Sequence, residues 1–141
     1  MRTLIVLGLT LVATIAAAGP KVPAAPGKPP SLDGIPAKGV TIVAKGKATP
    51  AEIWLEGHDT WKLQVRTKAG TFELEFPKLA VGTYRGTPKT GAWVVEITAA
   101  APGYLKSPGA CSGRIAAWFA DTTYVVGTFE SAGCLSYKQA P

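Results

Sequence analysis

Few side chains in this sequence could perform acid–base or nucleophilic chemistry. The chain has one histidine, His58, which lies in the turn Gly57-His58-Asp59. Asp59 follows it directly in the chain and is poorly placed to orient the imidazole ring, as the acid of a hydrolytic triad must do. The candidate serine nucleophiles lie in no nucleophile motif such as G-x-S-x-G; they are Ser107, Ser112, Ser131 and Ser136. We therefore interpret His58 as a polar turn residue and predict no catalytic residue.

A pair of carboxylates, Glu73 and Glu75, is the other place where catalysis is conceivable. Two residues apart on one strand face, they would lie about 7 Å apart, a spacing compatible with a glycosidase pair. In the register that we expect for strands 61–67 and 71–76, Arg66 lies opposite Glu73 and Gln64 lies opposite Glu75. These pairs favour a row of polar cross-strand contacts, a polar ladder, on the surface. We favour the ladder and keep a small hydrolase of envelope polymers, acting through these glutamates or His58, as the alternative.

Metal and cofactor sites lack the residues that they need. One histidine, two cysteines and three aspartates cannot assemble the usual zinc or calcium shells. The 16 glycines are scattered at turns and form no phosphate-binding loop. We expect no metal and no cofactor.

Aromatic side chains are the remaining candidates for ligand contact. Trp54 alternates with the apolar Ile53 and Leu55, so we expect it to face outward. Trp118 lies on a row opposite apolar residues, and Tyr104 lies in a segment bounded by proline and glycine. Exposed aromatic residues on a sheet can stack on sugar rings or anchor a partner. We take Trp54, Tyr104 and Trp118 as ligand-binding candidates; the other interpretation is that a loop or the proline-rich segment covers the tryptophans.

The first 18 residues are predicted to form a secretory signal peptide. Met1-Arg2 precedes an apolar run from Thr3 to Ile15, and small residues follow up to Ala18 and Gly19, between which we place the cleavage site. The run is shorter than the roughly 20 residues that a membrane span requires, and no second long run follows. We expect a secreted or periplasmic protein with no transmembrane span.

The charge balance is basic. Lys and Arg number 15 against 9 Asp and Glu, a net charge of +6, and loss of Arg2 would leave +5. This charge favours either attraction to anionic envelope polymers or plain solubility. Because the lysines form no run or stripe, we predict no nucleic-acid partner.

Residues 19–36 are predicted to form an extended proline-rich linker. Prolines recur every third residue, the period of a polyproline II helix; they are Pro20, Pro23, Pro26 and Pro29. The segment is either a docking peptide for an aromatic-lined groove or a semi-rigid tether. We favour the tether and expect it to contribute little to folding.

Residues 37–141 are predicted to form a single antiparallel β-sandwich of about eight strands. β-branched and aromatic residues dominate, glycine or proline recurs every 8 to 12 residues, and no helical periodicity is sustained. Trp61 and Trp93 fall on apolar rows and are predicted to be core residues. The segment 99–110 is the longest expected loop, either a crossover between sheets or a binding loop. Strands are expected at 40–45, 52–56, 61–67, 71–76, 82–86, 92–99, 114–120 and 124–130.

The hairpin of strands 61–67 and 71–76 has a predicted register. Alternation on both faces is satisfied when Val65 pairs with Leu74 and Leu63 with Phe76, around a loop of four residues. A slip by one residue would move one apolar row to the wrong face.

Cys111 and Cys134 are predicted to form a disulfide bond. They are 23 residues apart, unlike a C-x-x-C redox or metal pair, and they flank the C-terminal hairpin. If Asp121 to Tyr124 form a four-residue loop, the two cysteines lie directly opposite each other.

The stretch Val126-Gly127-Thr128-Phe129-Glu130, followed by Cys134, resembles the closing hairpin of small secreted bacterial β-sandwich proteins of unknown function. The resemblance implies the fold and the location and transfers no functional residue. Together these observations favour a non-enzymatic secreted or periplasmic module that binds an envelope polymer or protein. A further alternative is a secreted inhibitor or accessory subunit that presents the 99–110 loop to a protein partner.

Export is directly testable. Because small residues precede Gly19, N-terminal sequencing of the exported protein should begin at Gly19 or within a residue or two of it. A soluble cytoplasmic protein that keeps Met1 would contradict the prediction.

Overall fold

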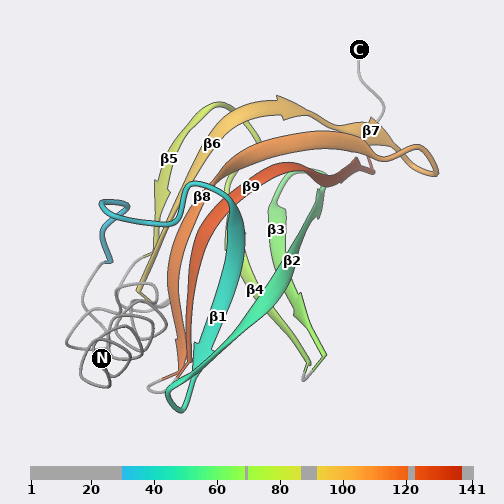
Figure 1. Ribbon diagram of the computed structural model, residues 1–141. Coiled ribbons are helices and arrows are strands. Elements are labelled where there is room, and N and C mark those ends of the chain that lie inside the picture. Colours follow the sequence, from blue (N-terminus) through green and yellow to red (C-terminus); the bar gives the residue numbers. More distant parts are fainter. Residues whose placement is uncertain (1–29, 69, 87–91, 121–122, 138–141) are drawn as a thin grey trace, which may run out of the picture.

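The computed structural model of the protein describes residues 30–68, 70–86, 92–120 and 123–137 (Figure 1). These residues form nine β-strands and no helix, which confirms the predicted all-β class. No helix that could span a membrane occurs in these ranges. The predicted signal peptide and its cleavage site lie outside the described residues. The strands are β1 (Gly39–Ala44), β2 (Lys47–Gly57), β3 (Trp61–Thr67), β4 (Gly70–Phe76), β5 (Gly82–Arg85), β6 (Trp93–Ala101), β7 (Gly103–Tyr104), β8 (Gly109–Ala120) and β9 (Thr123–Ser136).

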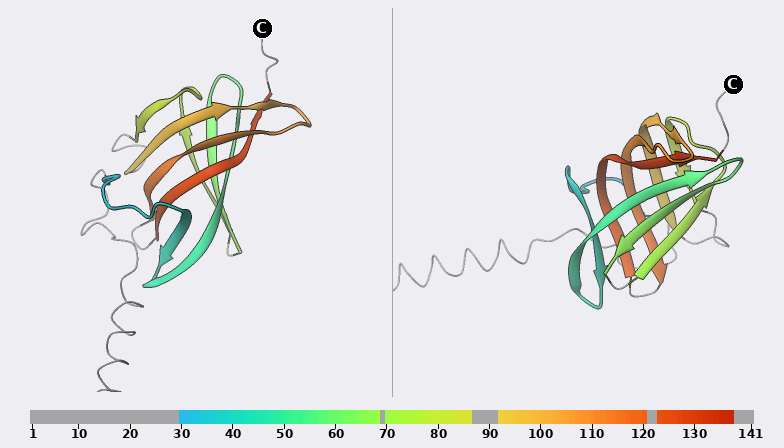
Figure 2. Two further views of the ribbon diagram at one scale, coloured as in Figure 1. Left: turned by 45° about the horizontal axis from the view of Figure 1, so that its top comes forward. Right: turned by 90° about the vertical axis from the view of Figure 1, so that its right-hand side faces the viewer.

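All nine strands belong to one sheet rather than to two. The order is β4-β3-β2-β1-β9-β8-β6-β5, with β7 paired to β9. Neighbours are antiparallel except for two short parallel pairings, β2 with β9 and β7 with β9. Figures 1 and 2 show the sheet curled into a half-barrel, so that β6, β8 and β9 arch over β2, β3 and β4. The second sheet of the expected sandwich is not found among the described residues.

The concave face of the curled sheet holds the main core. Both halves of the sheet contribute to a single apolar cluster, which includes Trp61 and Trp93 as predicted. The halves also touch directly: the ring centroids of Phe72 in β4 and Phe119 in β8 lie 5.3 Å apart. Because long strands twist and coil, one sheet can bury its own apolar face in the way that two stacked layers would. Fully buried members from the two halves include Leu55, Leu63, Val65, Val95, Ile97 and Ile115.

The register of the β3–β4 hairpin differs from the predicted one by two residues. Val65 pairs with Phe72 and Leu63 with Leu74, while Thr67 pairs with Gly70. The strands are therefore joined across two residues, the commonest hairpin connection, and not across four. A shift by two keeps every side chain on its predicted face but changes all of the cross-strand partners.

The C-terminal hairpin shows the same kind of difference. Ala120 pairs with Thr123, so two residues and not four separate the paired positions of β8 and β9. Bulges interrupt the ladder, and Cys111 pairs with Ala132 while Cys134 pairs with Gly109. The cysteines are therefore diagonal neighbours, in contrast to the directly opposed pair that we expected.

The expected loop at 99–110 is largely sheet. β6 continues to Ala101, β8 already begins at Gly109, and the two-residue strand β7 lies between them. Small residues such as alanine and glycine carry a weak strand propensity, so the sequence pattern did not reveal these extensions.

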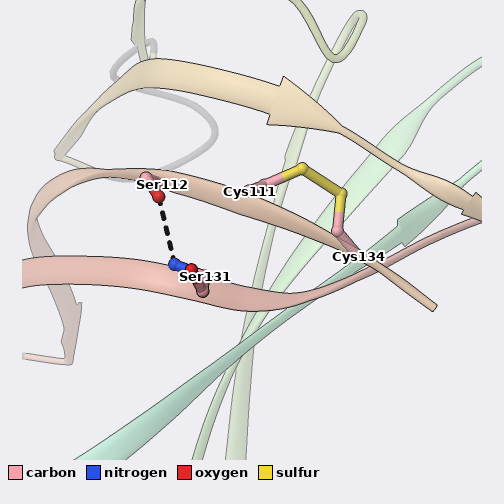
Figure 3. The surroundings of a disulfide bond; sticks show 4 residues. All are labelled: Cys111, Ser112, Ser131 and Cys134. Carbon is pink, nitrogen blue, oxygen red and sulfur yellow. Dashed lines mark hydrogen bonds between the residues drawn. A yellow bond between two sulfur atoms is a disulfide. The ribbon is translucent and has the colours of Figure 1, made fainter.

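The predicted disulfide is present. Cys111 and Cys134 are bonded, with Cα atoms 5.9 Å apart, and both side chains are fully buried in the core (Figure 3). Nearby, the Ser131 N–H donates to Ser112 Oγ at 3.0 Å across the same two strands. The bond therefore joins β8 to β9 close to their bulges.

Replacing one of these cysteines should destabilise the fold. Cys111→Ser opens the covalent loop and leaves a hydroxyl in the apolar core, so the free energy of unfolding should fall by about 2–5 kcal/mol. Chemical denaturation of the oxidised proteins measures the difference. Two reactive thiols in the native wild-type protein would contradict the bond.

The end of the proline-rich segment packs on the sheet, a contact that its composition did not predict. Leu32 and Ile35 pack on a second apolar cluster on the convex face, where Tyr124 and Val126 of β9 are buried. Thr128 Oγ1 also donates to the Pro36 carbonyl at 2.7 Å. We call residues 30–38 the strap. Two apolar residues in a proline-rich context have no periodicity, which is why the pattern missed them.

Removing the apolar contacts of the strap should lower stability. Ile35→Ala should lower the free energy of unfolding by about 1–2 kcal/mol. This is less than the same substitution costs at a fully buried position, because Ile35 is half-buried. Val81→Ala, at a position that is 69% exposed, is the control and should change little. Equal unfolding midpoints for Ile35→Ala and wild type would mean that the strap does not support the sheet.

Candidate functional site

The sheet opens where β1 begins. Gly39, the first residue of β1, pairs with Thr128 of β9, and Val40 pairs with Ala51 of β2. On the N-terminal side of Gly39, no described strand lies between β2 and β9. These two strands pair directly only from Trp54 and Gly133 onward. An open hollow of about 550 Å³ lies in the interval between the two pairings.

The hollow has an apolar floor and a charged rim. Its floor includes the buried core residues Val40, Ile53 and Phe129. A neighbouring recess of about 370 Å³ shares Glu52 and Arg66 with it, so the depression continues over β2 and β3. The charged residues that line the hollow are Lys38, Glu52, Arg66 and Glu130.

Trp54 forms one wall and is held by contacts with its neighbours. Its indole Nε1 donates to Glu56 Oε1 at 3.1 Å, and the Arg66 guanidinium lies 4.9 Å from its ring centroid. Gly133 lies against the ring: a Cβ at Gly133 would come within 2.3 Å of two ring carbons. Trp54 therefore faces outward, as expected, but it is half-buried and fixed in orientation.

The rim charges are not neutralised by each other. Arg66 pairs with Glu52 in the ladder, yet its guanidinium donates to Gln64 Oε1 at 2.8 and 3.1 Å and forms no ion pair with Glu52. Within the described ranges, Lys38, Glu52 and Glu130 have no side-chain hydrogen bond or ion pair. Charges of both signs thus remain available to a ligand in the hollow.

The end of β9 is tied to the same surface. The Tyr137 hydroxyl donates to Glu56 Oε2, and this hydrogen bond to the carboxylate raises the pKa of Tyr137. The Tyr137 N–H also donates to the Gly57 carbonyl at 2.8 Å. Glu56 therefore links Trp54 to the chain that leaves β9.

The structure does not bring the three aromatic candidates together. Trp118 packs on Tyr124, with ring centroids 4.9 Å apart, in the cluster beneath the strap. Tyr104 lies on β7 and does not line the hollow. Of the three, Trp54 alone lines the hollow.

The carboxylates and the histidine considered for catalysis lie elsewhere on the surface. Glu73 accepts from Gln64 Nε2 at 3.2 Å, and Glu75 pairs with Lys62 in the ladder, so both have partners two residues away from those expected. His58 Nδ1 lies 3.1 Å from Asp59, with both side chains exposed. No group of three or more potential metal ligands occurs in the part of the chain that the structure describes.

Sequence reasoning missed Lys38, Glu130 and Gly133 as site residues. Lys38 and Glu130 come next to Trp54 only through the pairing of strands that are distant in the chain. Gly133 carried the one available signal, because a glycine inside a strand often marks a close approach.

Comparison of the chain with protein-family models, with curated proteins and with solved structures found no match.

Gly133→Ala should displace the Trp54 ring. The added methyl group has no room beside the indole, so the variant should lose about 1–3 kcal/mol of stability. In a Trp54→Ala background the same change should cost much less, and denaturation of the four proteins of this double-mutant cycle measures the coupling. An equal cost in both backgrounds would show that the ring is not what Gly133 accommodates.

Proposed function

We propose that this protein is a non-enzymatic, exported module that binds a polymer of the cell envelope at the hollow between β1, β2 and β9. One observation carries the proposal: a preformed hollow combines an apolar floor, an oriented tryptophan and charged groups that form no ion pair with one another in the described residues. Ligand sites of this size are typically apolar with a few placed polar groups. A side chain that is already oriented loses little freedom on binding.

The locations and partners of the reactive side chains favour binding over catalysis. Glu73 and Glu75 belong to a solvated ladder with Gln64 and Lys62, and His58 lies in an exposed turn beside Asp59. Neither group lines the hollow. A hydrolase would need an acid and a base or nucleophile facing one bound substrate.

Location and partner class are supported by two properties of the chain. A buried disulfide is typical of proteins in oxidising compartments. The net charge of +6 favours association with anionic polymers. The curled sheet serves as a sandwich-like scaffold, whose two halves take the place of separate layers.

Co-sedimentation with insoluble envelope polymer tests this proposal. Trp54→Ala should weaken binding by about 1–3 kcal/mol, which is roughly a fivefold to 150-fold rise in Kd. His58→Ala and Glu73→Gln should bind as wild type does. Val81→Ala, which changes an exposed residue outside the hollow, is the matched control.

Three outcomes would contradict the proposal. A folded Trp54→Ala protein that binds as tightly as wild type would remove the hollow from recognition. Release of soluble fragments from the polymer, abolished by Glu73→Gln or His58→Ala, would favour the hydrolase. Failure of the wild-type protein to sediment with the polymer would favour the inhibitor or accessory-subunit alternative, with the partner on the 99–110 segment.

A further inference from the structure

Exposed apolar side chains gather where β7 meets the end of β9. Tyr104 is 40% exposed, Leu105 48% and Tyr137 47%, and they are three of the four large exposed apolar side chains in the described part of the chain. Tyr104 pairs with Ser136, and the Leu105 N–H donates to the Ser136 carbonyl at 3.2 Å. We call residues 103–109 the β7 tip. Figure 1 shows it projecting beyond the arch of the sheet.

The β7 tip is built to hold one shape. A Cβ at Gly103 would lie 1.6 Å from the Ser107 carbonyl oxygen, and one at Gly109 would lie 1.9 Å from that of Ala101, so both positions require glycine. The Ser107 N–H donates to the Tyr104 carbonyl at 3.1 Å. Gly109 pairs with Cys134, so the disulfide braces the base of the tip.

Leu105 is an unfavourable residue for its position in two respects. Its φ of 49° is in the left-handed region, where a bulky side chain is strained and asparagine or glycine is preferred. Its apolar side chain is also half exposed to water. Folding alone would favour a small polar residue, and such outliers motivate a functional hypothesis.

Basic charge predominates in the segments that form the tip. Residues 97–113 and 131–137 contain no aspartate or glutamate, and Lys106 is exposed beside Leu105. Glu56, which Tyr137 contacts, is engaged by the Tyr137 hydroxyl and by the Trp54 indole. An anionic surface would therefore meet a cation and apolar groups at the tip.

We propose that the β7 tip is a lipid-contacting element, which places Leu105 and Tyr104 in the interfacial region of an anionic bilayer. A convex tip needs no pocket in its partner, and a bilayer has none. Tyrosine is suited to the boundary between lipid and water, and a lysine is attracted to anionic headgroups. The rigid base holds these side chains outward, so that little conformational freedom is lost on contact.

Vesicle co-sedimentation tests the proposal with residues 19–141, which include every described residue. Wild type should bind vesicles of phosphatidylglycerol and phosphatidylcholine in equal parts more strongly than vesicles of phosphatidylcholine alone. Leu105→Asn should weaken binding by about tenfold, the order expected when one leucine side chain is kept from an apolar environment. Its thermal stability should stay equal or rise, because asparagine tolerates the left-handed backbone. Val81→Ser removes a comparably exposed apolar side chain elsewhere and should bind as wild type does.

Four results would overturn the proposal. The wild-type protein could fail to bind the anionic vesicles, or it could bind both kinds of vesicle equally well. Leu105→Asn could bind the anionic vesicles as tightly as wild type does, or Val81→Ser could lose as much binding as Leu105→Asn. A dimer that depends on Leu105 and excludes vesicles would instead assign the tip to a second copy of the chain. Because the hollow plays no part in these measurements, their failure leaves the polymer-binding proposal standing.

Discussion

The single sheet of the described residues has to bury its apolar face with no second sheet over it. The sheet meets this constraint by curling until its two halves share a single core, and the aromatic contact of Phe72 with Phe119 joins them across the interior. Phe76 of β4 and Tyr84 of β5, on the two edge strands, also lie with ring centroids 5.2 Å apart. The core is therefore continuous, although no ladder is found between β4 and β5 in the described residues.

Curling also explains where the candidate site lies. β9 is long enough to pair with β1 along one part of its length and with β2 along another. Before Gly39, where β1 begins, the ladder has a gap, and core residues such as Ile53 line the hollow. The hollow is thus a consequence of unequal strand lengths, and its charged rim comes from the strap, β2, β3 and β9.

Alternation of side chains predicted the parts of this fold that depend on local pattern. All eight expected strands exist, and Trp54, Trp61 and Trp93 lie on the faces assigned to them. Registers were less predictable, because alternation constrains a hairpin only to within steps of two residues. Loop length decides between those steps, and both hairpins are joined across two residues and not four. Contacts between segments that are distant in the chain determine where the strap and β7 lie. They also bring together the site residues Lys38, Glu130 and Gly133. A local sequence pattern contains no information about such contacts.

The central place of β9 has a consequence for the order of folding. This strand is hydrogen-bonded to β1, β2, β7 and β8, and it supplies one half of the disulfide, yet it follows all of the other described strands in the sequence. Until residues 123–136 have been synthesised, β1 and β8 have no common neighbour and the curled core cannot close. Pairings between segments so far apart form slowly, so the curled sheet closes only once β9 is available.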